Sequence, residues 1–162
     1  RSTYTVADMK ISDDGKLTWK TKGEQGKLPF VVEQYRWNKW VAVGEVQGKG
    51  SGGENSYEFK VAPHSGVNTV RIVQEDHSGT KRPSKEIKFT SDSPIVTKTP
   101  AQVRNEIKFL ANGQPIETRY EIYDAYGNIV KKGVGSSVNC SNLLRGVYYI
   151  NFDNVNEKFI KK

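Results

Sequence analysis

Hydrophobic and polar residues alternate along most of this chain, in short runs that turn-forming residues separate. The run Ser56-Tyr-Glu-Phe-Lys-Val61 is the clearest, and its alternation places Tyr57, Phe59 and Val61 on one inward face. Strict alternation over about four to eight residues predicts a half-buried β-strand. No stretch shows the period of an amphipathic helix. The pattern therefore predicts an all-β protein.

The first half of the chain is predicted to hold about seven short strands. An Asp13-Asp14-Gly15 turn precedes one of them, and Asn38-Lys39 is predicted to form the tip of a hairpin. Residues 47–55 are rich in glycine and serine and are predicted to be a flexible loop. Six of these strands have assigned ranges, residues 16–20, 30–37, 40–46, 56–61, 68–75 and 85–90.

The second half repeats this pattern, with about six or seven strands, as in a compact sandwich. Val103, Ile107 and Phe109 mark a strand that ends at the turn dipeptide Asn112-Gly113. The fold class predicted for the whole chain is all-β, as two tandem antiparallel immunoglobulin-like β-sandwiches. The further strands of this half are predicted at residues 118–124, 128–132, 136–139, 146–152 and 158–161.

The boundary between the halves is predicted between Thr90 and Pro100, where two prolines stand among small and polar residues. Proline removes a ladder donor and pushes its predecessor towards extended geometry. The predicted domains are residues 1–90 and 101–162, with residues 91–100 as a linker. In an alternative, Ile95 and Val96 pair as a short first strand of the second half.

Charge and cysteine content exclude some classes of function. The net charge of +7 is spread along the chain, because residues 1–92 hold 15 basic and 12 acidic residues and residues 93–162 hold 10 and 6. Nucleic-acid binding needs basic residues gathered on one face, so we predict solvated strand faces instead, with weak attraction to acidic surface polysaccharide as the alternative. Cys140 is the single cysteine, so no intrachain disulfide forms.

The sequence also bears on location and completeness. No run of about 18 apolar residues is present, so no transmembrane segment is predicted. The chain begins at Arg1 with neither a methionine nor an apolar signal region, so we expect it to be a fragment.

No catalytic, metal or cofactor site is predicted. His64 and His77 lie in predicted turns, and Cys140 has no histidine near it in sequence. The glycines of residues 48–53 do not follow a strand and open a helix, as a phosphate-binding loop requires. Asp13-Asp14-Gly15 lacks the rest of a calcium-loop pattern. We therefore predict that this chain is not an enzyme and holds no cofactor.

An aromatic cluster suggests an alternative function. Tyr35, Trp37 and Trp40 surround the predicted hairpin tip, and exposed aromatic rings stack on sugars. A carbohydrate- or protein-binding adhesion module is therefore the alternative hypothesis for the first half. In a strand one face is buried, however, so Tyr35 and Trp37 would share a face that only forms core. A flat exposed row of these rings would support binding.

The first half resembles a known family. Trp19 stands where fibronectin type III modules place a core tryptophan in the second strand, and a hairpin and the Gly79 turn follow in the expected order. Residues 13–90 therefore resemble a fibronectin type III or related immunoglobulin-like module, although the usual strand tyrosine is absent from residues 67–72. The resemblance implies a spacer or accessory module.

The second half resembles a different family. Three segments carry this resemblance, Tyr120-Glu-Ile-Tyr-Asp-Ala-Tyr-Gly127, Leu143-Leu-Arg-Gly-Val-Tyr148 and Lys158-Phe-Ile-Lys-Lys162. In order and spacing they are similar to the C-terminal sorting domains of the type IX secretion system of the Bacteroidota. The resemblance implies residues for recognition of the sorting signal, namely Asp124, Gly127, Leu143, Gly146, Tyr148, Lys158, Phe159, Ile160, Lys161 and Lys162.

The same resemblance implies partners and a location. The outer-membrane machinery of type IX secretion would bind the domain and escort an upstream cargo domain of the same precursor. A sortase would then cut within or near residues 91–101 and attach the cargo to anionic lipopolysaccharide. The protein would pass through the periplasm and be secreted or attached to the outer cell surface. We expect Phe159 and Ile160 to anchor the last strand, with Lys161 and Lys162 solvated.

Overall fold

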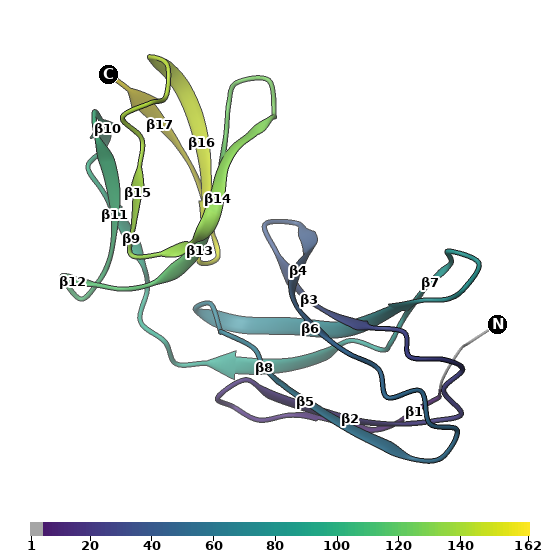
Figure 1. Cartoon of the computed structure of the whole chain (residues 1–162). Helices are drawn as coiled ribbons and strands as arrows, with labels where there is room; N and C mark the ends of the chain where they lie inside the picture. Colours follow the sequence, from purple (N-terminus) through teal and green to yellow (C-terminus); the bar gives the residue numbers. More distant parts are fainter. Residues whose placement is uncertain (1–4) are drawn as a thin grey trace. The chain divides into compact units, whose positions relative to one another are not determined.

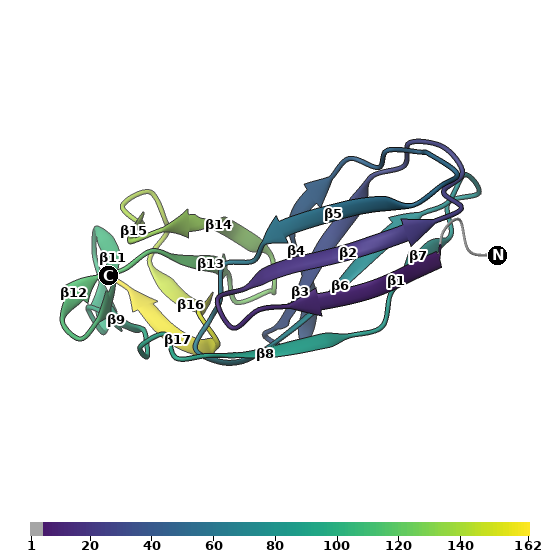
Figure 2. The ribbon, with the colours of Figure 1, turned by 90° about the horizontal axis from the view of Figure 1, so that it is seen from below.

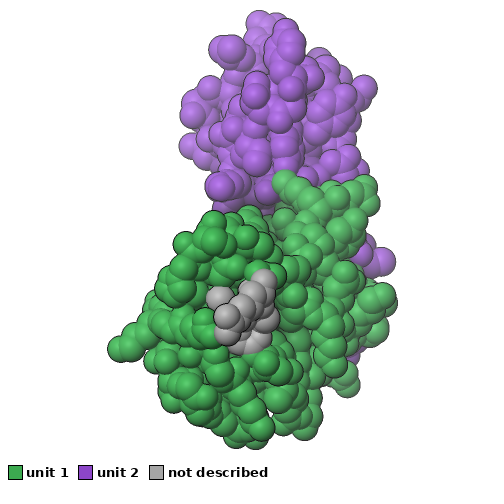
Figure 3. Space-filling model, turned by 90° about the vertical axis from the view of Figure 1, so that its right-hand side faces the viewer, with its two compact units in different colours: residues 1–91 green, residues 92–162 purple. Residues whose placement is uncertain are grey.

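A computed structural model describes residues 5–162 of the chain. The chain divides into two compact units, residues 1–91 and residues 92–162, coloured separately in Figure 3. All regular elements in the described residues are β-strands, and four sheets build two sandwiches. The predicted fold class, all-β with two tandem sandwiches, is confirmed.

The first unit is a sandwich of two sheets, which form two layers in Figure 1. Its strands, as far as the structure describes them, are β1 (Thr5–Ile11), β2 (Lys16–Lys22), β3 (Phe30–Arg36), β4 (Lys39–Val46), β5 (Asn55–Lys60), β6 (Gly66–Glu75), β7 (Lys81–Pro83) and β8 (Ile87–Ser91). One sheet has the order β1-β2-β5, visible side by side in Figure 2. The other has the order β4-β3-β6-β7, with β8 also paired to β6.

Alternation along the strands builds the core of this sandwich. Trp19 on β2 lies opposite Tyr57 on β5, and their rings stack with centroids 5.4 Å apart. Phe30, from the other sheet, packs against Trp19 in a T-shaped arrangement with ring centroids 5.7 Å apart. Burying an aromatic side chain of this kind contributes about 1.5–3 kcal/mol. The predicted inward positions of Tyr57 and Val61 are confirmed, and Phe59 packs against the same core.

The β3–β4 hairpin turns one residue earlier than predicted. Arg36 pairs with Lys39, so the two-residue loop is Trp37-Asn38, and both residues have positive φ, 56° and 62°. This is the backbone of a type I′ turn, whose twist matches that of the flanking strands. Tryptophan is rare at such a position, so the sequence favoured the wrong pair. The expectation that Trp37 continues the face of Tyr35 is therefore wrong.

The second unit is a smaller sandwich. Its strands are β9 (Thr97–Thr99), β10 (Gln102–Val103), β11 (Glu106–Ala111), β12 (Gln114–Pro115), β13 (Thr118–Tyr123), β14 (Ile129–Gly135), β15 (Ser137–Asn139), β16 (Gly146–Phe152) and β17 (Val155–Lys161). A five-stranded sheet has the order β10-β17-β16-β13-β14, and it faces a sheet in which β9, β12 and β15 pair with β11 (Figure 1). β10 pairs in parallel with β17, whereas the other pairs are antiparallel.

The core of the second unit is separate from that of the first. Phe109 from one sheet packs against Phe152 from the other, with ring centroids 5.4 Å apart. Val96 is buried in this core, and β9 pairs with β11, so much of the segment between the predicted domains is part of the second sandwich. Within residues 92–96, Asp92, Pro94 and Ile95 are exposed.

Candidate functional site: one end of the five-stranded sheet

The three segments that the sequence singled out meet at one end of the five-stranded sheet. Tyr123, which ends β13, lies opposite Tyr149 on β16. Gly146, which begins β16, lies opposite Lys161 on β17. The strand register therefore brings the β13–β14 turn, the loop before β16 and the last residues of β17 to the same end of the sheet. We call this region the motif end.

Asp124 and Gly127 shape the turn between β13 and β14. The Asp124 carboxylate accepts hydrogen bonds from the backbone amides of Tyr126 and Asn128, both at 2.9 Å. The hydrogen bond from the Asn128 amide leads the interactions that lower the pKa of Asp124. Gly127 has a φ of +88°, which disfavours a side chain. Asp124 thus uses its carboxylate within its own turn, and Gly127 supplies the required backbone geometry.

Leu143, Gly146 and Tyr148 hold the loop that leads into β16. Leu143 packs against the core, and the buried Tyr148 ring stacks on Phe159 at 5.5 Å. The Tyr148 hydroxyl donates a hydrogen bond to the Leu144 carbonyl at 2.7 Å, which ties the loop to the strand. Gly146 is exposed, has a φ of +148°, and has open space where a Cβ would lie.

The last five residues divide between the core and the surface. Phe159 is buried, as expected, whereas Ile160 lies on the outer face of the sheet and is 40% exposed. Lys161 was expected to be solvated, and this is wrong, because its side chain lies on the inner side of β17 and its Nζ donates to the Lys162 carbonyl at 3.0 Å. Lys158 and Lys162 are exposed. The Lys162 amide also donates to the Val103 carbonyl at 2.8 Å.

Sequence reasoning missed several exposed apolar side chains at this end. Tyr126 in the β13–β14 turn is 90% exposed, and Leu144 in the loop before β16 is 82% exposed. Val147 and Tyr149 are also exposed, on the outer face of the sheet. The alternation in residues 146–152 places both on one face, but the sequence alone does not say that this face points to solvent.

The aromatic hairpin of the first unit is neither a flat exposed row nor a buried core. Tyr35 is 42% exposed, and its ring forms a T-shaped pair with the Trp40 ring, with centroids 5.2 Å apart. The Arg71 guanidinium lies 4.1 Å from the centre of the Trp40 ring and pairs with Glu33 at 2.8 Å. Arg71 therefore occupies a face of Trp40 on which a sugar ring would stack. Trp37 lies in the turn and is only partly exposed.

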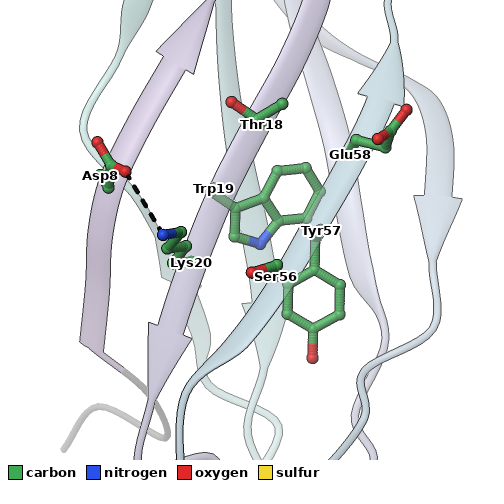
Figure 4. A pocket seen from close by; sticks show the side chains of 7 residues that line it. All are labelled: Asp8, Thr18, Trp19, Lys20, Ser56, Tyr57 and Glu58. Carbon is green, nitrogen blue, oxygen red and sulfur yellow. Dashed lines mark ion pairs between the residues drawn. The ribbon is translucent and has the colours of Figure 1, made fainter.

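A shallow hollow of about 220 Å³ lies on the sheet β1-β2-β5 of the first unit. Figure 4 shows its lining, in which Lys20 reaches Asp8 at 4.0 Å. Asp8 has a φ of 61° where the register of β1 and β2 shifts. Trp19 and Tyr57 take part in the lining but belong to the core. This site offers mainly the charges of Asp8, Lys20 and Glu58 to solvent, while the indole Nε1 of Trp19 is buried without a hydrogen-bond partner.

The residues that the structure describes contain no cluster of three or more histidine, cysteine or acidic side chains suited to a metal ion. Cys140 is buried, and burial raises the pKa of its thiol. Across residues 5–162, no helix long and apolar enough to cross a membrane is found.

Several solved structures are similar to this chain. They include fibronectin type III domains of chicken CNTN1 (13% identity, 97% of this chain, 67% of that chain, TM-score 0.35) and a two-domain fibronectin type III segment of chicken tenascin (13%, 96%, 97%, TM-score 0.32). A biofilm-associated protein BSP domain is 16% identical over 99% of this chain, with a TM-score of 0.32. This chain spans 28% of that structure. TM-scores this low do not establish a shared fold, so the architecture described above rests on the strand order of the chain itself.

The sequence comparisons place the second unit in a family. No curated protein matches the chain significantly. Residues 99–162, however, match the family model of the secretion system C-terminal sorting domain. The matched range contains all three segments of the motif end and most of the second sandwich. Such a domain implies interaction with the type IX secretion machinery and secretion across the outer membrane. Residues 99–162 are therefore a C-terminal sorting domain of this family, preceded by a β-sandwich module.

Proposed function

We propose that the second sandwich is the signal by which the outer-membrane machinery of type IX secretion recognises this protein, and that it escorts the attached polypeptide to the cell surface. The family match of residues 99–162 carries this proposal. The meeting of the three motif segments at one end of the sheet supports it, because one surface could then present all of them to the machinery. The secreted protein would be released or retained on the outer surface.

Export of a reporter tests this proposal. A fluorescent reporter with an inner-membrane export signal is fused to residues 1–162 or to residues 1–91, in a host that has type IX secretion. We expect fluorescence at the surface or in the medium only for the fusion that contains the second sandwich. Retention of both fusions in the periplasm, with the second sandwich shown to be folded, would contradict the proposal.

We further propose that a sortase removes the second sandwich by cutting within residues 92–95 and attaches the cargo to an anionic surface polysaccharide. Proteases need an exposed, extended segment. Ile95 is 75% exposed, whereas Val96 is buried and Thr97–Thr99 pairs with β11. Mass spectrometry of the exported protein should give a new C-terminus between Ser91 and Val96. A C-terminus beyond Thr99, or an uncut protein, would sink this idea.

We propose that the first sandwich is a spacer between the cargo and the sorting domain. The arrangement of its aromatic hairpin supports this, since Arg71 lies on the Trp40 ring and Trp37 is taken up by the turn. The discriminating measurement is a titration of the purified chain with oligosaccharides, following tryptophan fluorescence. Saturable quenching that Tyr35→Ala abolishes would instead favour the adhesion hypothesis.

A further inference from the structure

The outer face of the five-stranded sheet in the second unit is polar at one end and apolar at the other. Tyr148, Ile150 and Phe152 of β16 are buried in the core, so the alternate residues Val147, Tyr149 and Asn151 lie on the outer face, where Asn151 is itself buried. Residues that pair with these three on the neighbouring strands lie on the same face. Asn151 lies between Glu121 and Asn156, and Tyr149 lies next to Tyr123.

The polar end is satisfied within the sheet. The Asn151 side-chain amide donates a hydrogen bond to the Glu121 carboxylate at 3.2 Å. The Asn156 side-chain amide donates a hydrogen bond to the side-chain oxygen Oδ1 of Asn151. The Tyr123 hydroxyl also donates to Glu121, at 2.8 Å. These side chains already have partners, so this end does not require a further protein to complete its hydrogen bonds.

The apolar end is a continuous patch that crosses four strands, and we name it the apolar half-face. Ile160 on β17 lies opposite Val147 on β16, and Tyr149 lies opposite Tyr123 on β13, which in turn pairs with Ile129 on β14. Ile160, Val147, Tyr149 and Ile129 are 38–45% exposed. Single exposed apolar residues are normal, whereas a contiguous exposed patch marks an interaction surface. The patch begins at the motif end.

Basic side chains surround the apolar half-face. Lys158 lies directly opposite Tyr149, and the exposed Arg145 and Lys162 lie at the adjoining motif end. Two carboxylates nearby keep their negative charge, but Glu121 is buried and Asp124 is only partly exposed, so the fully exposed charges of this rim are basic. An apolar centre with a charged rim is the usual anatomy of a protein–protein interface.

The charge of this rim selects among occupants. A second copy of the chain would bring two basic rims together, and like charges across an interface oppose association. A membrane surface favours side chains that protrude into the acyl region, whereas these residues lie half-exposed on a hydrogen-bonded sheet. A protein partner with an acidic rim around an apolar centre matches both the shape and the charge.

We propose that the apolar half-face is where the sorting domain docks onto a protein of the secretion machinery whose contact surface is apolar at its centre and acidic at its rim. This inference rests on the proposed function and adds the surface and the chemistry of the partner.

The test compares two triple variants of the full chain, each fused to the exported reporter. The half-face variant carries Val147→Thr, Tyr149→Thr and Ile160→Thr, and threonine keeps the strand propensity. The control variant carries Val67→Thr, Tyr35→Thr and Val134→Thr, which also removes exposed apolar groups but outside both the half-face and the proposed cleavage segment. We expect export to fall about tenfold or more for the half-face variant, and to stay within about twofold of the parent for the control.

Measurements on the purified parent and variant proteins accompany the export assay. Melting midpoints must show that both variants are folded; if the half-face triple variant is not, Tyr149→Thr and Ile160→Thr are tested singly. Light scattering and sedimentation with anionic phospholipid vesicles then examine the other occupants. A dimer of the parent that the half-face variant loses would assign the surface to a second copy, and vesicle binding that it loses would assign it to a membrane. Either result overturns the inference.

The export result also separates this inference from the proposed function. Equal export of parent and half-face variant overturns the docking surface but leaves the sorting role in place. A folded parent that is not exported overturns the sorting role, and the docking surface falls with it.

Discussion

At the scale of single residues, Glu24 connects distant parts of the first sandwich. Its carboxylate accepts hydrogen bonds from Thr21, Asn55 at 2.8 Å, the Tyr57 hydroxyl at 2.5 Å and the Gly50 amide at 3.1 Å. Burial alone would raise the pKa of Glu24, but these hydrogen bonds outweigh it and the pKa is lowered. The carboxylate therefore orders part of residues 47–55, the segment predicted to be a flexible loop.

Replacing this carboxylate should make the stability of the first sandwich less dependent on pH. Because the pKa of Glu24 is lower in the folded state than its usual value of 4.5, ionised Glu24 stabilises the fold above about pH 4.5. That contribution disappears as the pH falls through the folded-state pKa. We expect Glu24→Gln to lower the free energy of unfolding of the first sandwich by about 1–3 kcal/mol at pH 7 and by much less at pH 3.

Denaturant unfolding followed by tryptophan fluorescence measures this effect, because all three tryptophans lie in residues 1–91. Comparing variant and parent at each pH cancels the contribution of other acids, such as Asp76, whose pKa is lowered to about 2 by hydrogen bonds from Ser78. If the difference in unfolding free energy between variant and parent stays constant from pH 7 to pH 3, the ionised form of Glu24 is not the source of the stabilisation.

Gly146 provides a second test at this scale, between a recognition role and a backbone role. Its φ of +148° strains any other residue, although a Cβ would meet no atom within 4 Å. We expect Gly146→Ala to destabilise the second sandwich by about 1–2 kcal/mol through backbone strain alone. Scanning calorimetry of the full chain measures this change.

Gly113→Ala is the matched control, since Gly113 also has positive φ, +77°, and open space around its Cβ position. If the two variants lose similar stability and are exported equally well, Gly146 serves only the backbone. If Gly146→Ala alone loses export, the predicted recognition role holds.

At the scale of strands, β17 carries residues predicted to be recognised by the secretion machinery as well as residues that stabilise the fold. It lies between β10 and β16, and Phe159 on this strand is buried against Tyr148. Removing Lys158–Lys162 would therefore remove part of the core and a parallel strand pair as well as the exposed basic groups. Loss of export after such a truncation would not identify a recognition signal.

We expect truncation after Glu157 to unfold the second sandwich. Loss of a buried phenylalanine alone costs about 3–5 kcal/mol, while a unit of 71 residues has a total stability of about 4–10 kcal/mol. Lys158→Gln with Lys162→Gln should leave the fold intact, because both side chains are exposed. Circular dichroism melts of the three proteins check this, and a cooperative melt of the truncated chain's second sandwich would contradict the expected role of Phe159.

The strands that the sequence predicted are those with clear alternation. The buried faces of β2 and β5 were predictable because large apolar residues alternate with polar ones, as Leu17 and Trp19 do on β2 and Tyr57 does on β5. β1 was missed because its single buried residue is Met9 and its register shifts near Asp8. β7 was missed because a three-residue edge strand that contains Pro83 carries no period.

The candidate site was predictable only in part, for a similar reason. Alternation shows which residues share a face, but burial decides whether that face is core or surface, and burial depends on the partner sheet. The predicted strand at residues 146–152 therefore puts Val147 and Tyr149 on one face without assigning that face to solvent. The buried Lys161 was unpredictable for the opposite reason, since its position on the inner face of β17 overrides the usual preference of lysine for water.

At the scale of the whole molecule, each unit has the parts of an independent domain. Each contains two sheets and its own hydrophobic core, and the two cores share no residue. Val96 and β9 belong to the second core and its sheet, although Val96, Thr97 and Lys98 lie before the first matched residue, Thr99. A complete sorting domain should therefore begin at about Asp92.

We expect residues 92–162 to fold alone, whereas residues 101–162 should be less stable. The shorter fragment loses Val96 from the core and β9 from the edge of β11, and the loss of a buried valine of this kind costs about 1–3 kcal/mol. Thermal unfolding by circular dichroism compares the two fragments, with Val96→Ala in residues 92–162 as the control for the side chain alone. If both fragments melt alike, the segment before Ala101 is a linker, as the sequence predicted. If the longer fragment is the more stable and is also the better export signal, the sorting domain includes Val96 and the whole of β9, which begins before the family match.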